Sequence, residues 1–145
     1  MREDKARVIV KYLFDTDIIS SLMKGKASGR LLSRMEGAGR SNQAISSITV
    51  FEIVYGAYHT SSPQRFLGLF EQKVLPFVDI LAFDETAARL AGRIRAEREA
   101  LGKPIAPMDL QIAAIALATG RILVTGNTKH YADIGSLDIE NWLEG

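Results

Sequence analysis

Short apolar runs alternate with helix-like segments along the whole chain, and this alternation constrains the fold more than any other feature. Strand-like runs are predicted at residues 8–15, 43–48, 77–83, 121–126 and 137–143. Helices are predicted at residues 17–25, 27–39, 49–62, 63–74, 85–102 and 107–120. Strands that alternate with helices are typical of an α/β fold with a mostly parallel central sheet flanked by helices.

Capping and breaking residues set the expected helix boundaries. Thr49 and Asp84 can each accept a hydrogen bond from the first turn of the helix that follows. Pro63 and Pro107 suit a first helical turn, where a backbone donor is not needed. Gly120 is expected to end the helix that Pro107 begins. These boundaries place each helix between two strands.

The length, charge and amino-acid composition of the chain exclude several classes of function. A chain of 145 residues suits one domain, expected to span residues 1–145. The net charge of +1 argues against a protein that coats DNA through charge alone. The absence of cysteine excludes disulfides and Cys-ligated zinc, and two histidines, His59 and His130, argue against a histidine-rich metal site. No apolar run reaches membrane-spanning length, so we expect a cytoplasmic protein with no signal peptide.

Polar residues fall at strand ends and helix starts. Asp15 ends the first strand, Glu52 and Asp109 are expected in the first turns of helices, and Asn127 follows a strand. In a parallel sheet these positions share one edge, where ligands bind. Three carboxylates gathered there would repel by about 1 to 4 kcal/mol per pair at 4 Å. A hard divalent ion, Mg²⁺ or Mn²⁺, would remove that repulsion and could activate water against a phosphate.

Each of these residues also has a structural explanation. Asp109 is at a position typical of a helix cap or dipole partner, and Asp17 could cap the helix that it begins. Asn127 after a strand is typical of a turn. Glu52 is harder to explain structurally, because an unpaired carboxylate between Phe51 and Ile53 would be costly. Their joint placement therefore favours a site over four separate structural roles.

Four blocks of the sequence resemble those of the PIN-domain ribonucleases, and within them the VapC toxins of toxin–antitoxin pairs. The blocks are LFDTDIISSLMKG, ISSITVFEIVYGA, GRIRAEREALGKPIAPMDLQIAAIALATG and ILVTGNTKHYADIGSLDIENW. The resemblance covers the chain from about Val8 to Trp142. Residues 1–7 lie outside it and are expected to form a loose N-terminus.

The resemblance implies a three-layer fold and an endoribonuclease that depends on Mg²⁺, with Mn²⁺ as a substitute. It implies that Asp15, Glu52, Asp109 and Asn127 are catalytic. Of these, Asp15, Asp109 and Glu52 would be metal ligands, with Asp17 as a further candidate. It also implies an RNA substrate, a homodimer, and a VapB-type antitoxin whose tail blocks the acidic pocket. The EIVYGA and GKPIAPMD blocks are similar to those of toxins that cut the anticodon loop of initiator tRNA.

The sequence departs from the family pattern at three positions. Asp17 replaces the usual Asn, Gly126 replaces an Asn, and His130 stands where relatives often have an acid. The first departure adds a charge beside Asp15. The other two departures flank the fourth site position, Asn127.

Two other function classes stay open from the sequence. The FDTDI stretch also resembles the start of haloacid-dehalogenase phosphohydrolases, in which Asp15 would be a nucleophile and Asp17 an acid/base. That fold needs a later Lys and a second acidic pair, which APMDLQIAA does not supply. A PIN domain that only binds RNA or protein is the other class, and the presence of Asp15, Glu52 and Asp109 argues against it.

Overall fold

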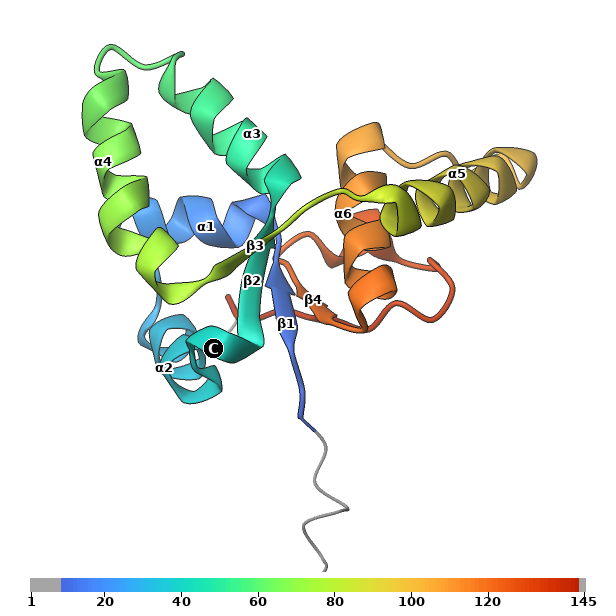
Figure 1. The fold of residues 1–145 in the computed structure, drawn as a ribbon, viewed down its shortest axis with the longest axis horizontal. Helices are drawn as coiled ribbons and strands as arrows, with labels where there is room; N and C mark the ends of the chain where they lie inside the picture. Colours follow the sequence, from blue (N-terminus) through green and yellow to red (C-terminus); the bar gives the residue numbers. More distant parts are fainter. Residues whose placement is uncertain (1–8, 144–145) are drawn as a thin grey trace, which may run out of the picture.

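A five-stranded parallel sheet forms the centre of the protein in a computed structural model that describes residues 9–143 (Figure 1). The strand order is β3-β2-β1-β4-β5, and every neighbouring pair is parallel. The strands are β1 (Tyr12–Phe14), β2 (Gln43–Ser46), β3 (Asp79–Leu81), β4 (Ile122–Val124) and β5 (Ile139–Glu140). The predicted α/β class is confirmed, while the loose N-terminus expected at residues 1–7 lies outside the described residues.

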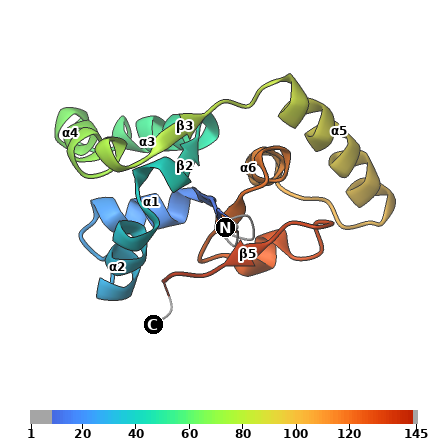
Figure 2. The same ribbon diagram turned by 60° about the horizontal axis from the view of Figure 1, so that its bottom comes forward.

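Helices cover both faces of the sheet (Figures 1 and 2). They are α1 (Thr16–Met23), α2 (Gly29–Ala38), α3 (Ser47–Ala57), α4 (Pro63–Lys73), α5 (Glu85–Ala100) and α6 (Pro107–Thr119). Adjacent residues of β1 face opposite cores: Leu13 packs in the core that includes α5 and α6, and Phe14 in the core that includes α1 and α2. This alternation produces the predicted three layers.

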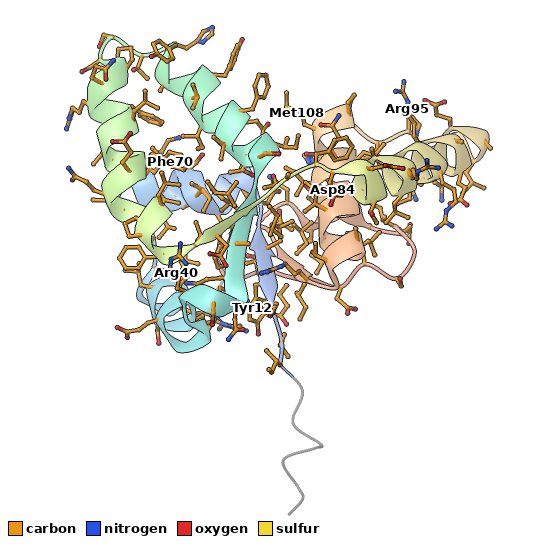
Figure 3. The ribbon with its side chains drawn as sticks, in the orientation of Figure 1. Tyr12, Arg40, Phe70, Asp84, Arg95 and Met108 are labelled. Atoms are coloured by element: carbon orange, nitrogen blue, oxygen red, sulfur yellow. The ribbon has the colours of Figure 1, made fainter. Side chains whose placement is uncertain are left out.

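Most predicted helix boundaries are confirmed. The Asp84 carboxylate accepts a hydrogen bond from Ala87 N at 3.0 Å at the start of α5 (Figure 3). Pro63 and Pro107 are the first residues of α4 and α6, and Gly120 ends α6 with a left-handed backbone (φ 66°). That conformation favours glycine because it lacks a Cβ.

The predicted Thr49 cap is wrong. Ser46 caps α3, and its hydroxyl accepts from Thr49 N at 3.0 Å, while Thr49 itself is buried. Strand β2 passes directly into α3, so the helix begins at Ser47 and Glu52 lies in its second turn instead of its first.

The first strand is shorter than the apolar run that predicts it. The run extends over residues 8–15, but β1 pairs with its neighbours only at Tyr12–Phe14, and Ile9 is 69% exposed. The apolar run therefore begins several residues before the strand does. Within residues 9–143, no helix combines the length and apolar character that crossing a bilayer would require.

Candidate active site

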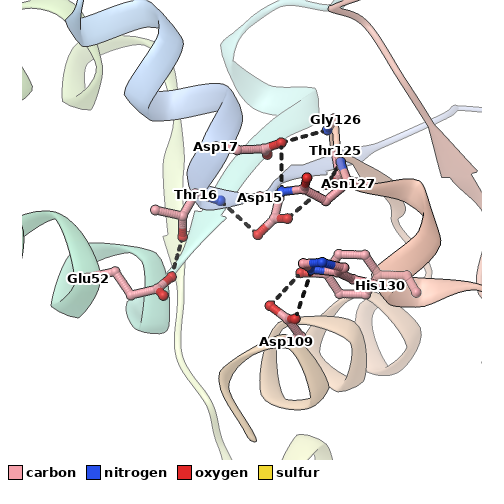
Figure 4. A network of polar contacts seen from close by, with 10 residues as sticks. Asp15, Thr16, Asp17, Glu52, Asp109, Thr125, Gly126, Asn127 and His130 are labelled. Atoms are coloured by element: carbon pink, nitrogen blue, oxygen red, sulfur yellow. Dashed lines mark hydrogen bonds and ion pairs between the residues drawn. The ribbon is translucent and has the colours of Figure 1, made fainter. Parts of the chain in front are cut away.

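Asp15 is a buried carboxylate at the junction of β1 and α1. Its Oδ1 accepts from Thr16 N at 2.8 Å and caps α1, and its Oδ2 accepts from the Thr125 hydroxyl at 2.8 Å, just beyond β4 (Figure 4). Burial raises the pKa of Asp15, and the negative charge of Asp109 adds to this, whereas the hydrogen bonds from Thr125 and Thr16 act in the opposite direction. The two donors explain how the fold tolerates a carboxylate there.

Asp109 reaches the same place from the first turn of α6. Its Oδ1 accepts from the Tyr131 hydroxyl at 3.3 Å, and its Oδ2 lies 3.3 Å from His130 Nδ1. Tyr131 is fully buried in η4 (Thr128–Tyr131), with its hydroxyl close enough to Asp15 for the two groups to interact electrostatically. Burial, followed by the charges of Asp15 and Asp109, raises the pKa of Tyr131. The structure therefore brings Asp15 and Asp109 together around one phenol.

Asp17 connects α1 to the turn after β4. Its Oδ2 accepts from Gly126 N at 2.8 Å and from Asn127 Nδ2 at 3.3 Å. Its Oδ1 is buried and has no hydrogen-bond partner among residues 9–143. Burial and the charge of Asp15 raise the pKa of Asp17. The expectation that Asp17 caps α1 is wrong, because Asp15 is the cap.

Gly126 fits closely between the side chains of Asp17 and Leu143. A Cβ at this position would lie 2.6 Å from Leu143 Cδ1 and 2.7 Å from Asp17 Oδ2. Both distances are shorter than van der Waals contact, so a side chain at this position would displace its neighbours. The glycine allows Asp17 to bond directly to the backbone of the turn.

Glu52 lies beside the pair of aspartates and not between them. The Thr16 hydroxyl donates to Glu52 Oε1 and also lies 3.0 Å from the Thr49 hydroxyl (Figure 4). No group of three His, Asp or Glu side chains in residues 9–143 is placed to hold a metal ion. The expected convergence of three carboxylates within a few ångströms is therefore absent from the described part, and Glu52 is linked to Asp15 through Thr16.

The donors present nevertheless fit a hard divalent cation. Mg²⁺ is commonly held by one or two carboxylates, with waters and substrate phosphates completing its coordination. Asp15 and Asp109 supply such a pair, and their side chains offer only oxygen. A site of this kind leaves positions open for water and phosphate.

Three polar residues of the site were not singled out in the sequence. Thr16 and Thr125 directly follow Asp15 and β4, so their places in the sequence were a usable signal. Tyr131 lies in a stretch whose sequence predicts only a loop, and no local pattern marks it.

Comparison with known proteins gives a consistent result. The family model described as "PIN domain" matches residues 12–135. The chain is 34% identical over 134 residues to the tRNA(fMet)-specific endonuclease VapC of Shigella flexneri, covering 92% of this chain and 99% of that protein. It is 35% identical to ribonuclease VapC2 of Haemophilus influenzae, over 93% of this chain and 100% of that protein.

Solved structures agree with the fold. The structure of DNA-bound VapBC from Salmonella typhimurium matches with a TM-score of 0.85 and 33% identity, covering 92% of this chain and 98% of that one. VapBC2 from Rickettsia felis, bound to a promoter DNA fragment, matches with a TM-score of 0.84 and 28% identity, over 92% and 99% of the two chains.

Proposed function

Because the chain belongs to the PIN-domain family, and within it to the VapC-type ribonucleases, we propose that it is the toxin of a VapBC pair and cleaves RNA at Asp15 and Asp109. The observation that carries this proposal is that Asp15 and Asp109 lie near one another at the carboxyl edge of the sheet, where the charge of Asp109 acts on Asp15. Family membership removes the haloacid-dehalogenase alternative. A PIN domain that only binds is disfavoured because Asp15, Glu52 and Asp109 are all present.

We further propose roles for the site residues. Asp15 and Asp109 hold a divalent metal, as PIN-domain nucleases generally require, and we propose Mg²⁺ with Mn²⁺ as a substitute. When bound, such an ion stabilises charge on the phosphate and lowers the pKa of water. Glu52 is half-buried and tethered by Thr16, so it can orient the attacking water. Asn127 and Asp17 hold the turn after β4 beside the metal ligands.

The proposed substrate and partners follow from the relatives. Proteins of Shigella flexneri and Salmonella typhimurium named as tRNA(fMet)-specific endonucleases are 34% and 32% identical to this chain, so initiator tRNA is the proposed substrate. The VapBC structures support a VapB-type antitoxin as partner. We also propose a homodimer, a cytoplasmic location, and a single PIN domain over residues 1–145.

Cleavage of initiator tRNA by the purified protein tests this function. Excess EDTA should abolish cleavage, and Asp15→Asn or Asp109→Asn should reduce it by at least about 100-fold, beyond the loss typical of a residue that only supports a ligand. Asp133→Asn, in an exposed turn, is the matched control and should cleave at the wild-type rate. Substantial cleavage in EDTA, or by Asp109→Asn, would overturn the metal-dependent mechanism.

A further inference from the structure

Tyr131 belongs both to the core and to the acidic site. Its side chain is fully buried in the core that includes Leu13 and Leu123. Its hydroxyl donates to Asp109 Oδ1 at 3.3 Å and also lies within electrostatic range of Asp15. Apolar packing holds the ring, so the hydroxyl has a fixed position beside Asp109 of α6 and near Asp15, the residue that caps α1.

The two carboxylates depend on this hydroxyl to different extents. Asp15 accepts from two other donors, Thr16 N and the Thr125 hydroxyl, whereas the Tyr131 hydroxyl donates to Asp109. Among the described residues, the other polar partner of the Asp109 carboxylate is the ring of His130, whose side chain is 59% exposed. Tyr131 is therefore the one buried donor that Asp109 has within residues 9–143.

Two neighbouring carboxylates repel one another, and a hydrogen bond donated to one of them opposes that repulsion. The phenol donates its one proton to Asp109, so it stabilises that carboxylate beside Asp15 without adding a charge of its own. Packing fixes where the oxygen lies, and its hydrogen bond ties the Asp109 carboxylate to that place.

We propose that Tyr131 is a positioning residue whose hydroxyl sets the spacing of Asp15 and Asp109 and so prepares this pair for a divalent cation. The inference rests on the proposed function, because it takes these aspartates as the metal-binding pair. In this proposal Tyr131 contributes to metal binding only by positioning the side chains that bind the metal.

Tyr131→Phe tests the proposal, since it removes one oxygen and keeps the ring that fills the core. Binding of Mn²⁺ is measured without RNA, by electron paramagnetic resonance. The dissociation constant for Mn²⁺ should rise about 10-fold, as is typical when a residue that supports metal ligands is lost. Cleavage should fall at low Mn²⁺ and return to the wild-type rate at saturating Mn²⁺, a rescue that a general packing defect would not show.

Tyr12→Phe is the matched control. Tyr12 lies on β1 but packs edge-on against Trp142, with ring centroids 4.8 Å apart, away from the two aspartates. This variant should bind Mn²⁺ like the wild type. The proposal is overturned if Tyr131→Phe binds Mn²⁺ normally, if Tyr12→Phe shows the same loss, or if saturating Mn²⁺ fails to restore cleavage.

A second measurement needs neither metal nor RNA. In metal-free protein, Tyr131→Phe should shift the unfolding temperature less in an Asp109→Ala background than in the wild type, because the hydroxyl has then already lost one partner. Equal shifts in the two backgrounds would contradict the proposal. If neither the wild type nor Tyr131→Phe cleaves RNA, the proposed function fails. Mn²⁺ binding and the comparison of unfolding temperatures in the two backgrounds still decide the role of Tyr131.

Discussion

Two carboxylates lie at the start of α1, and hydrogen bonds satisfy them to different extents: Asp15 is buried and Asp17 is half-buried. Both oxygens of Asp15 accept hydrogen bonds, from Thr16 N and from the Thr125 hydroxyl. In Asp17, Oδ2 accepts from Gly126 N and Asn127 Nδ2, whereas Oδ1 is buried with no partner among residues 9–143. A buried oxygen without a donor destabilises a fold by about 1 to 3 kcal/mol. Asp17 therefore keeps one buried oxygen that no hydrogen bond from the described residues stabilises, whereas both oxygens of Asp15 are hydrogen-bonded.

Replacement of Asp17 by Asn should stabilise the metal-free protein near neutral pH. The folded-state pKa of Asp17 lies above its ordinary value, so the folded state holds a proton that the unfolded state has already lost. Stability consequently falls as pH rises from about 4 through the folded-state pKa, and stays lower above it. A neutral amide in place of the carboxylate removes this loss, so the unfolding temperature of Asp17→Asn at pH 7 should be higher by about 3 °C.

Thermal unfolding of both proteins from pH 4 to 8 measures the effect. The difference between Asp17→Asn and the wild type should be smallest at pH 4 and should grow with pH. A variant that is less stable than the wild type at pH 7 would show that the charge on Asp17 is needed in the fold. Weaker Mn²⁺ binding by Asp17→Asn would instead place Asp17 among the metal ligands.

At the scale of elements, α5 supports the helix that carries Asp109. Helix α5 packs against α6 through Ala87, Ala91 and Ile94, in the core that also holds Leu110. The ion pairs Arg89–Glu85 and Arg95–Glu99 on its outer face are largely exposed, and such pairs contribute little. The Asp84 cap is the stronger local contribution to the start of this helix.

Loss of the Asp84 cap should therefore lower stability without changing the chemistry. Asp84→Ala is expected to cost about 1 kcal/mol. That corresponds to a fall of about 3 °C in the unfolding temperature measured by circular dichroism. Asp84→Asn, which also caps well, should stay near the wild type. A loss of cleavage per folded molecule in Asp84→Ala would show that α5 acts on the site directly.

At the scale of the whole molecule, strand order decides what meets at the carboxyl edge of the sheet. Strands β1 and β4 are neighbours, so Asp15 and Thr125 touch although 110 residues separate them. Helices α1, α3 and α6 bring Asp17, Glu52 and Asp109 to the same edge. The Asp109 side chain is 26% exposed, so the edge presents negative charge to solvent.

An acidic edge of this kind suits the guanidinium of a partner protein, because arginine pairs bidentately with carboxylates. We expect the antitoxin to inhibit through an arginine that occupies the place of the metal charge, with apolar residues beside it packing along α1 and α3. Changing that arginine to Ala should weaken inhibition strongly, and Lys should weaken it only mildly. Inhibition should also weaken as Mn²⁺ concentration rises. A complex in which the acidic edge is open and the partner binds elsewhere would refute this.

The sequence by itself determined the features that depend on residues a few positions apart. Alternation of strand and helix patterns predicted the parallel α/β sheet, and Asp84, Pro107 and Gly120 marked helix ends through bonds within one turn. The position of Asp15 at a strand end followed from the same local pattern. These interactions span one helical turn or one strand, so their partners are readable in the sequence.

Only the tertiary structure decided which side chains meet in the site. The rotation of α3, which begins at Ser47, turns Glu52 toward Thr16 instead of toward the aspartates. The contacts of Tyr131 with Asp109 and of Asp17 with Gly126 join segments 22 and 109 residues apart. Such contacts depend on how helices rotate and pack against the sheet, and a shift of one residue along a helix turns a side chain by about 100°. Local sequence does not fix that rotation, because the packing of the whole core sets it.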